Sequence, residues 1–494
     1  MSAETGRVIF PMLVGRFTWR SSMAKLWWCL VVLAAFAGCT RRNPAVCCLD
    51  AADCASIGAS ESARPCDLGL ACVKNECVVP SCSTQGCADT APVCNVEIDE
   101  CEGCDANADC ARFVDKPRCA TAVGQCVACV VSADCGPSAP VCDGFACRKC
   151  ELDSECESGA CGSDGACVNE SLIAYVDPIG VDAGDCNRAA PCRSAPFAIS
   201  KTTDVRNHVV LANASYALDR AFIVGPDLTP ASSLTLHGGG ASMTKDNGDM
   251  LFESRVPITI RDLTFRQQNG APISIHAPTG PSIFERVRIE GVSGLSVAST
   301  LTLRDVVLEG ISPVADRAGL IVAGGAVLDL ERTTVRGWDV CIASSYATLS
   351  SQLTMRNSLV FDCTKHAMAM DKTAGLVEFS TIARSGANTL QGGANAVSCV
   401  TSTLTFRASI VWAPGITSQP PLQGCNVVNS IVGPIAIPGA INSDPLFIDA
   451  AAGKFGLKAG SPARDAATMG PLTDVVKNAR PQGTAYDLGA YEGP

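Results

Sequence analysis

The stretch between Thr40 and Glu170 has almost no aromatic residues and no methionine. Phe113 and Phe145 are its only aromatic side chains. A segment of this size cannot bury a large apolar core with alanine and valine alone, so covalent cross-links must replace much of that core. Cysteine supplies them, because 22 of the 30 cysteines of the chain lie between Cys47 and Cys167. Such a density is typical of disulfide-stapled chains outside the reducing cytosol.

The chain also lacks the residues that several common functions need. It has 4 histidines, the first of them His208, and its formal net charge is −11 with no lysine or arginine cluster. This balance argues against a phosphate-binding surface, so no nucleic-acid partner is expected. No phosphate loop, Ser-His-Asp phrase or paired-histidine zinc phrase is present. The composition therefore predicts the cellular location and the architecture of the protein better than it predicts a catalysed reaction.

Long hydrophobic runs are absent apart from Leu26–Phe36, which follows the short basic start Met23-Ala-Lys25. A basic head and a short apolar run are typical of a secretory signal, and a membrane-spanning helix needs about 20 apolar residues. The ending Phe36-Ala-Gly-Cys39 resembles the bacterial lipobox, with Phe36 where leucine is usual. This resemblance implies a lipid on Cys39 and an exported protein of the bacterial outer membrane or cell surface. The alternative is an ordinary secretory signal. We assign residues 1–39 to an extension and signal whose natural start is Met23.

The cysteines of residues 40–170 repeat in sets of four. Three sets open with Cys-x5-Cys, two residues separate one set from the next, and a looser set starts at Cys82. Disulfides would use all 22 cysteines, but their connectivity cannot be deduced from spacing. A zinc site is the alternative, because Cys126-x2-Cys129 and Cys147-x2-Cys150 have four-cysteine spacing. The intervening cysteines and the export signal favour disulfides, so no metal is assigned. The cysteines of this chain that we expect in disulfides are Cys104, Cys110, Cys119, Cys126, Cys129, Cys135, Cys142, Cys147, Cys150, Cys156, Cys161, Cys167, Cys186 and Cys192.

The spacing of these sets resembles the cysteine-rich repeats of exported bacterial surface proteins. Chains with such repeats sometimes carry the transferred name tryptophan synthase alpha chain. An α/β barrel would need strands alternating with long amphipathic helices, and the sequence shows no such helices. Nothing in the sequence supports that activity.

Residues 171–494 contain a recurring phrase with apolar residues at alternate positions. Its charged anchors Arg261, Glu285, Arg304, Glu331 and Arg356 follow one another in steps of 24, 19, 27 and 25 residues. A loose period of this length predicts stacked coils of two or three short parallel strands, in roughly eight to ten coils. An all-β sandwich is the alternative. The copies are Ile258–Phe265, Ile283–Ile289, Leu301–Leu308, Leu328–Val335, Leu353–Val360, Leu376–Ile382, Leu404–Val411 and, more weakly, Val427–Val432.

This pattern resembles the right-handed parallel β-helices of the pectate-lyase-like superfamily. The segment Tyr175–Cys186, followed by Pro191-Cys192-Arg193, is similar to the opening of many exported bacterial β-helices. That likeness implies a bridge between Cys186 and Cys192 that caps the first coil. The closing phrases Gly460-Ser-Pro-Ala463 and Asp487–Glu492 resemble those of bacterial surface β-helices of the choice-of-anchor kind. The predicted fold class is thus all-β, a right-handed parallel β-helix preceded by a disulfide-rich, loop-dominated repeat module.

Enzymes on this fold need clustered carboxylates, often with calcium, or a carboxylate pair set for glycoside hydrolysis. The candidates for such chemistry have simpler structural explanations. The charged pairs fall inside the recurring phrase, where they suit the solvent side of a strand or turn. The acidic residues before Cys186 suit a turn as well as calcium, two histidines stand alone, and the late cysteines suit a core or disulfides. Cys341 and Cys363 are 22 residues apart, about one coil, and so could bridge. The candidates are Arg261, Asp262, Arg266, Arg304, Asp305, Asp177, Asp182, Asp185, His276, His366, Cys341, Cys363, Cys399 and Cys425.

No catalytic, cofactor-binding or metal residue is therefore assigned, and calcium is a candidate cofactor only if the chain is a polysaccharide lyase. The expected function is a non-catalytic surface lipoprotein that presents a β-helix to a polysaccharide or a surface protein and contacts the membrane only through its lipid. A polysaccharide lyase or glycoside hydrolase is one alternative, and a structural envelope protein is another.

Overall fold

The structure is a computed structural model. It describes residues 46–493 apart from 60–62, 64, 67–70, 79–81, 220, 226–230, 246–250, 268–272, 277–279, 312–316, 346–348 and 386–394. The signal-like run and Cys39 lie outside the described residues. The chain forms two compact units, Met1–Val127 and Ala128–Pro494. No helix within the described ranges has the length and apolar character needed to cross a bilayer.

The first unit consists of small antiparallel hairpins with short helical turns. In each hairpin two cysteines face each other across the strands, as Cys119 faces Cys126. The facing cysteines are bonded to earlier cysteines, not to one another. The elements are α2 (Ala51–Ser56), β1 (Ala71–Val73), β2 (Glu76–Val78), α3 (Cys82–Gln85), β3 (Val93–Asn95), β4 (Glu100–Glu102), η1 (Asn107–Cys110), β5 (Arg118–Ala120) and β6 (Gln125–Val127).

The second unit begins with two more repeats of the same design. One contains η2 (Ser132–Asp134) and the hairpin β7 (Val141–Asp143) and β8 (Ala146–Arg148), and the other contains η3 (Asp153–Glu155). In the four sets that start at Cys82, Cys104, Cys129 and Cys150, the first cysteine bonds the third and the second bonds the fourth. The remaining bonds before Cys167 are Cys47–Cys72, Cys48–Cys54 and Cys66–Cys77.

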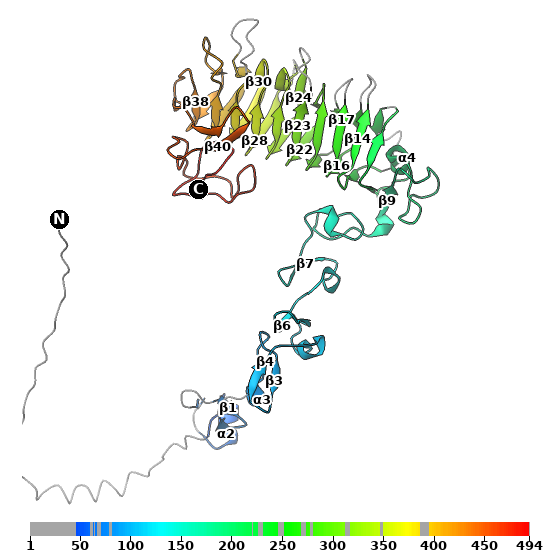
Figure 1. Cartoon of the computed structure of the whole chain (residues 1–494), viewed down its shortest axis with the longest axis vertical. Coiled ribbons are helices and arrows are strands. Elements are labelled where there is room, and N and C mark those ends of the chain that lie inside the picture. The colour runs from blue at the N-terminus through cyan, green and yellow to red at the C-terminus, as the bar shows by residue number, and fades with distance from the viewer. Residues whose placement is uncertain are drawn as a thin grey trace, which may run out of the picture. The chain divides into compact units, whose positions relative to one another are not determined.

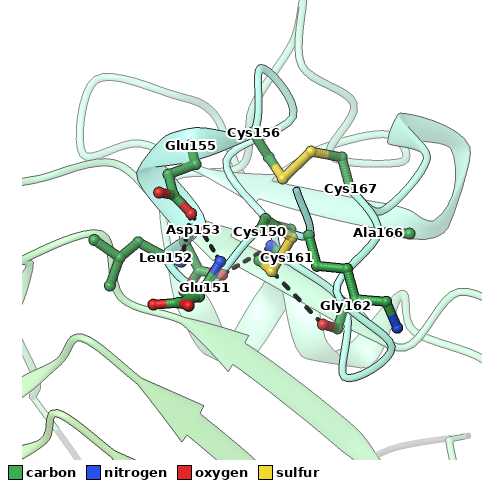
Figure 2. Close-up of a disulfide and its surroundings, with 12 residues drawn as sticks. Cys150, Glu151, Leu152, Asp153, Glu155, Cys156, Cys161, Gly162, Ala166 and Cys167 are labelled. Atoms are coloured by element: carbon green, nitrogen blue, oxygen red, sulfur yellow. Dashed lines mark hydrogen bonds between the residues drawn. A yellow bond between two sulfur atoms is a disulfide. The ribbon is translucent and has the colours of Figure 1, made fainter. Parts of the chain in front are cut away.

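A carboxylate before the second cysteine shapes each of the last three repeats. In the repeat Cys150–Cys167, Oε2 of Glu155 accepts hydrogen bonds from the backbone N–H groups of Glu151 (2.7 Å) and Leu152 (3.0 Å). Figure 2 shows this turn beside the Cys150–Cys161 and Cys156–Cys167 bridges. Asp109 and Asp134 make the same pair of contacts in their own repeats. Each carboxylate satisfies donors that open a short 3₁₀ turn.

Residues Ile173–Gly433 form a right-handed parallel β-helix, which confirms the predicted fold class. The strands of successive coils stack into three parallel sheets (Figure 1). The first sheet has 11 strands. They are β9 (Ile173–Val176), β10 (His208–Leu211), β13 (Leu234–His237), β16 (Ile258–Arg261), β19 (Ser282–Glu285), β22 (Thr300–Arg304), β25 (Val327–Glu331), β28 (Ser351–Arg356), β31 (Thr373–Glu378), β34 (Thr403–Arg407) and β37 (Asn426–Val428).

The second and third sheets follow the first around each coil. The second consists of β11 (Ser215–Ala217), β14 (Ser242–Lys245), β17 (Thr264–Gln267), β20 (Arg288–Gly291), β23 (Val307–Gly310), β26 (Thr334–Arg336), β29 (Leu359–Phe361), β32 (Thr381–Ala383), β35 (Ile410–Trp412) and β38 (Ile431–Gly433). The third consists of β12 (Phe222–Val224), β15 (Phe252–Ser254), β18 (Ile273–Ile275), β21 (Leu295–Val297), β24 (Ala318–Val322), β27 (Val340–Ser344), β30 (His366–Asp371), β33 (Val397–Val400) and β36 (Leu422–Gln423). Each complete coil contributes one strand to every sheet, whereas the first coil contributes only β9 and the last contributes β37 and β38.

The recurring phrase of the sequence spans the corner between the first two sheets. In Ile258–Phe265, β16 ends at Arg261, the chain turns at Asp262, and β17 begins at Thr264. Asp262 has a φ of 51°, and the residue at the same corner has positive φ in each following coil as far as Asn429. Alternate side chains such as Ile258 and Ile260 point inward and are buried. The phrase therefore encodes two strands and a sharp turn, and the variable loops lie elsewhere on the coil.

The interior of the β-helix is apolar and continuous from coil to coil. Trp338 is fully buried, and the ring of Phe252 packs against those of Phe222 and Phe265. Three disulfides join neighbouring parts of this domain, namely Cys186–Cys192, Cys341–Cys363 and Cys399–Cys425. The helical turns η4 (Glu170–Leu172) and α4 (Ala195–Ser200) flank the first strand, β9.

The C-terminal segment packs on the outside of the last coils. The antiparallel pair β39 (Phe447–Asp449) and β40 (Lys454–Leu457) contributes Phe447 and Phe455 to a second apolar cluster with Phe361 and Phe379. Further along, the buried Arg480 lies 3.3 Å from the Glu492 carboxylate and donates to the carbonyls of Asp487 and Gly489. The closing phrase of the sequence therefore has a structural role, because its buried ion pair and hydrogen bonds hold the C-terminal segment together.

Candidate functional site

A ladder of alternating charge runs along the corner of the β-helix. The last residue of seven successive strands in the first sheet is Arg261, Glu285, Arg304, Glu331, Arg356, Glu378 and Arg407, and each pairs in register with the next. We call this set the charged ladder. Because neighbouring parallel strands lie about 4.8 Å apart, each carboxylate stands between two guanidinium groups. The order of the seven side chains follows from the register of the coils.

The strongest contacts of the ladder surround Glu378. Its Oε1 accepts a hydrogen bond from Nε of Arg356 (2.6 Å), and its Oε2 accepts one from Nε of Arg407 (3.1 Å). The Glu378 side chain is 4% exposed, whereas those of Arg356 and Arg407 are 43% and 52% exposed. Burial raises the pKa of Glu378, but the two guanidinium groups outweigh burial and hold that pKa below its ordinary value. Glu378 is therefore an ionised, buried carboxylate that orients the side chains of two accessible arginines.

A second row of ion pairs lies beside the ladder, at the positive-φ corner. Arg286 donates to both oxygens of Asp262 at 2.7 and 2.8 Å, and Nε of Arg332 donates to Asp305 at 2.7 Å. Burial opposes ionisation of Asp305, yet Arg332 and Lys477 hold its pKa below the ordinary value. The carboxylates of this row are thus engaged by cations.

A groove of about 500 Å³ opens over the C-terminal half of the ladder. One wall is formed by Glu331, Arg356, Glu378 and Arg407, and the other by residues 467–471. A side-chain amide holds the second wall in place, since Nδ2 of Asn429 donates to the Ala466 carbonyl at 2.9 Å. The groove combines accessible guanidinium groups with an apolar rim that includes Met469.

One carboxylate in the strand that carries Glu331 has a raised pKa, in contrast to Glu378 and Asp305, whose pKa values are lowered. Asp329 lies in β25 two residues before Glu331, between Thr302 and Thr354 of the neighbouring strands. Burial raises the pKa of Asp329 and repulsion from Glu331 adds to it, against the attraction of Arg356 and Arg304. Alternate residues of a strand share one face, so Asp329 and Glu331 point to the same side of the sheet.

The sequence candidates Arg261, Asp262, Arg304 and Asp305 belong to the ladder and its neighbouring row. Arg266 lies on the second sheet and donates to Glu290 at 2.9 Å. His366 Nδ1 contacts the Asn395 carbonyl at 2.7 Å, and His276 is exposed. None of these histidines joins the groove lining.

The remaining candidates occupy turns and bridges. Asp182 accepts the backbone N–H groups of Arg193 and Ser194, so its carboxylate orders the turn before α4. Asp177 accepts the N–H of Ile179, and Asp185 is exposed. Cys341, Cys363, Cys399 and Cys425 form disulfides, as do the four cysteines with zinc-like spacing, Cys126, Cys129, Cys147 and Cys150. A bonded sulfur is not the thiolate that a zinc site or a nucleophile requires.

Two arrangements escaped sequence reasoning. The sequence alone does not point to Asp329, because a lone acidic residue in a strand gives no signal until its neighbours in space are known. The buried residues Asp153 and His237 and the half-buried His208 come together from two modules of the chain, and only the coil register brings the two histidines side by side.

All 28 cysteines among the described residues are in disulfides, which marks the chain as an exported protein. No family model matches the sequence, and no curated protein matches it. Among solved structures, pectate lyase Pel9A shares 12% identity over 65% of this chain and 96% of its own, with a TM-score of 0.43. A rhamnogalacturonan lyase shares 8% identity over 56% of this chain and 90% of its own, with a TM-score of 0.29.

Proposed function

We propose that the chain is a non-catalytic surface lipoprotein whose β-helix binds an extended glycan along the charged ladder. The observation that carries the proposal is the pairing of one buried carboxylate, Glu378, with two accessible arginines. The contacts to Glu378 use Nε and Nη2 of Arg356 and of Arg407. A guanidinium group has five N–H donors, so each arginine keeps donors for a sugar hydroxyl or carboxylate.

The ion pairs of Glu378 and Asp305 disfavour a catalytic role for these two carboxylates, either as a general base or as calcium ligands. A general base or a calcium site needs carboxylate oxygens that are free to bind a proton or a cation. In the ladder, Glu378 is instead engaged by its two neighbouring arginines, which hold its pKa below the ordinary value. In the neighbouring row, Arg332 and Lys477 hold the pKa of Asp305 below its ordinary value in the same way. Binding is therefore the function that these residues support.

A binding assay on the purified full chain tests this proposal. The protein is incubated with a panel of neutral and acidic polysaccharides, with and without calcium, and bound and released sugars are identified by mass spectrometry. Retention of intact chains is expected. Replacement of both ladder arginines (R356Q with R407Q) should weaken retention at least tenfold. R288Q, which removes a 39% exposed arginine of the second sheet, is the matched control and should leave retention unchanged. If the chain captured a protein and bound no sugar, the partner would be a surface protein and not a glycan.

Lipidation at Cys39 is the second part of the proposal, supported by the lipobox-like ending of the apolar run. Mass spectrometry of the mature N-terminus in a bacterial host is expected to show an acylated Cys39. C39S should yield a protein that leaves the membrane fraction. An unmodified Cys39 inside a longer mature chain would contradict this part without affecting glycan binding.

Glycoside hydrolysis is the second candidate function, because Asp329 combines a raised pKa with a second carboxylate, Glu331, on the same face. An acid with a raised pKa and a nearby carboxylate are the two groups that such hydrolysis uses. Shortened sugars that disappear in D329N would establish the hydrolase. Unsaturated fragments would instead indicate a lyase. Neither binding nor cleavage would leave a structural role in the envelope.

A further inference from the structure

The last cysteine repeat, Cys150–Cys167, is fastened to the first coils of the β-helix within the second compact unit. Arg261 donates from Nη1 to the Cys161 carbonyl, and Tyr175 donates its hydroxyl to the Ser158 carbonyl at 3.1 Å. Ala160 packs with Ile173 and Tyr175 in a small apolar cluster. Beside these contacts lies a cavity of about 500 Å³ whose apolar lining includes Val210, Leu211 and Leu263. The repeat therefore covers apolar surface of the β-helix.

A chain of three titratable groups crosses this contact. Oδ1 of Asp153, in the repeat, lies 2.8 Å from Nδ1 of His237 in β13. Nε2 of His237 lies 3.0 Å from Nδ1 of His208 in β10, and the two rings are stacked. Asp153 and His237 are 3% and 0% exposed. Asp153 Oδ1 also accepts the N–H of Cys161 at 2.9 Å (Figure 2). The same carboxylate therefore orders the repeat and contacts His237 of the β-helix.

The hydrogen bond between the two rings restricts how many protons they can hold. One of the facing nitrogens must donate and the other must accept, so one ring has to remain neutral. If both rings become imidazolium cations, both nitrogens carry protons and the two charges repel. Asp153 can compensate one cation of this pair but not two.

The charged surroundings disfavour the second proton. Burial, together with the charges of His237 and Arg261 and against the attraction of Asp153, lowers the pKa of His208 to about 4. The other charges that face the chain are Glu285, which pairs with Arg261, and the Asp262–Arg286 pair. Burial opposes ionisation of Asp153, but His237, the Cys161 N–H and Arg261 hold the pKa of Asp153 below its ordinary value.

We propose that the repeat Cys150–Cys167 is an acid-releasable clasp on the β-helix, controlled by the ring-to-ring contact of His208 and His237. Released His208 would regain an ordinary pKa near 6.5, whereas docked His208 titrates at about 4. Protons therefore bind the released state more tightly, and docking weakens as the pH falls from 6.5 towards 4. Protonation of Asp153 would add to the release at still lower pH. Release would expose Ala160, Ile173, Tyr175 and the apolar side of the cavity.

Hydrogen exchange of the full chain tests the clasp, with the backbone N–H of Cys161 as the reporter because its acceptor is Asp153. In the wild type, opening of this amide should increase roughly ten- to a hundredfold between pH 6.5 and pH 4, beyond the change in intrinsic exchange. Binding of a hydrophobic dye should rise over the same range while the circular dichroism of the β-helix stays constant. These two wild-type measurements do not depend on the folding of any variant.

The four histidines of the chain provide matched variants. H208N keeps a donor and an acceptor but cannot titrate, so its Cys161 amide should show no opening specific to this pH range. H276N and H366N alter histidines outside the clasp and should behave like the wild type. A wild-type amide that stays closed down to pH 4 would overturn the proposal. The same opening in H208N as in the wild type would overturn it as well.

Discussion

Asn357 and Thr473 join segments that are 116 residues apart, because Nδ2 of Asn357 donates to the Thr473 carbonyl at 2.8 Å. Asn357 is fully buried and has a φ of 49°. Asparagine adopts this left-handed conformation more readily than other non-glycine residues, and its amide reaches the C-terminal segment from the corner of the coil. The Asn357 side chain thus favours the left-handed backbone conformation at the turn, and it also holds the C-terminal segment that forms the outer wall of the groove.

Replacement of Asn357 separates these two contributions. N357G should lose the hydrogen bond alone, at a cost of about 1–2 kcal/mol, because glycine accepts positive φ. N357A should cost about 1 kcal/mol more, because alanine is strained in the left-handed region. Urea unfolding gives the free energies, and faster exchange in residues 467–475 should accompany both variants. Equal stability of the two variants would show that the backbone conformation is not strained for alanine.

The sequence predicted the β-helix because its corner phrase is short, repeated and apolar at alternate positions. Ile258 and Ile260 show this clearly, since both point inward and the following Asp262 turns the chain. The bridge between Cys341 and Cys363 was also within reach, because a spacing of 22 residues is close to one coil. The sequence pattern alone predicts a contact when the two residues are separated by about one repeat, because such residues lie in neighbouring coils.

The candidate site was harder to predict because it depends on register. Loops of different length lie between the anchors, so steps of 19 to 27 residues hide the fact that Arg304 stands beside both Glu285 and Glu331. The partner of His237 comes from another module, and no spacing within the β-helix points to Asp153. The first-to-third and second-to-fourth disulfide pattern was equally open, since alternative pairings fit the same spacing.

The stability contributed by Glu378 should depend on pH. Its pKa is lowered in the folded protein, so its stabilisation is present above the ordinary value of 4.5 and is lost as the pH falls through the lowered value. E378Q should lower the free energy of unfolding by about 1–3 kcal/mol at neutral pH, because it leaves two partly exposed arginines without their shared anion. The difference between wild type and E378Q should shrink in acid. E290Q, a more exposed carboxylate on the second sheet, should have a smaller effect at neutral pH. A difference between wild type and E378Q that does not change with pH would contradict this account.

The Cys341–Cys363 bridge should contribute more than Cys399–Cys425. The two loops are of similar size, 22 and 26 residues, so their entropic effects on the unfolded chain should be nearly equal. Cys341 and Cys363 are within 1% of full burial, whereas Cys399 is 7% exposed and Cys425 lies at the edge of the core. Replacement of the first pair by alanine should cost about 3–5 kcal/mol, and of the second about 2–3 kcal/mol. Urea unfolding of the two double variants measures both, and the reverse order would show that strain outweighs burial.

Gly319 should be intolerant of even one added methyl group. A Cβ atom at this position would lie 2.3 Å from Cε3 of Trp338, which is a rigid ring atom inside the fully buried core. The ring cannot move without displacing side chains of the coils above and below, so G319A should lower the free energy of unfolding by about 1–3 kcal/mol. Gly136 is the matched control, because a Cβ there has no atom within 4 Å, and G136A should be nearly neutral. Near-ultraviolet circular dichroism should register a changed environment of Trp338 in G319A alone. Wild-type stability of G319A would mean that the coil can widen at Trp338, and the spectrum would then locate that change.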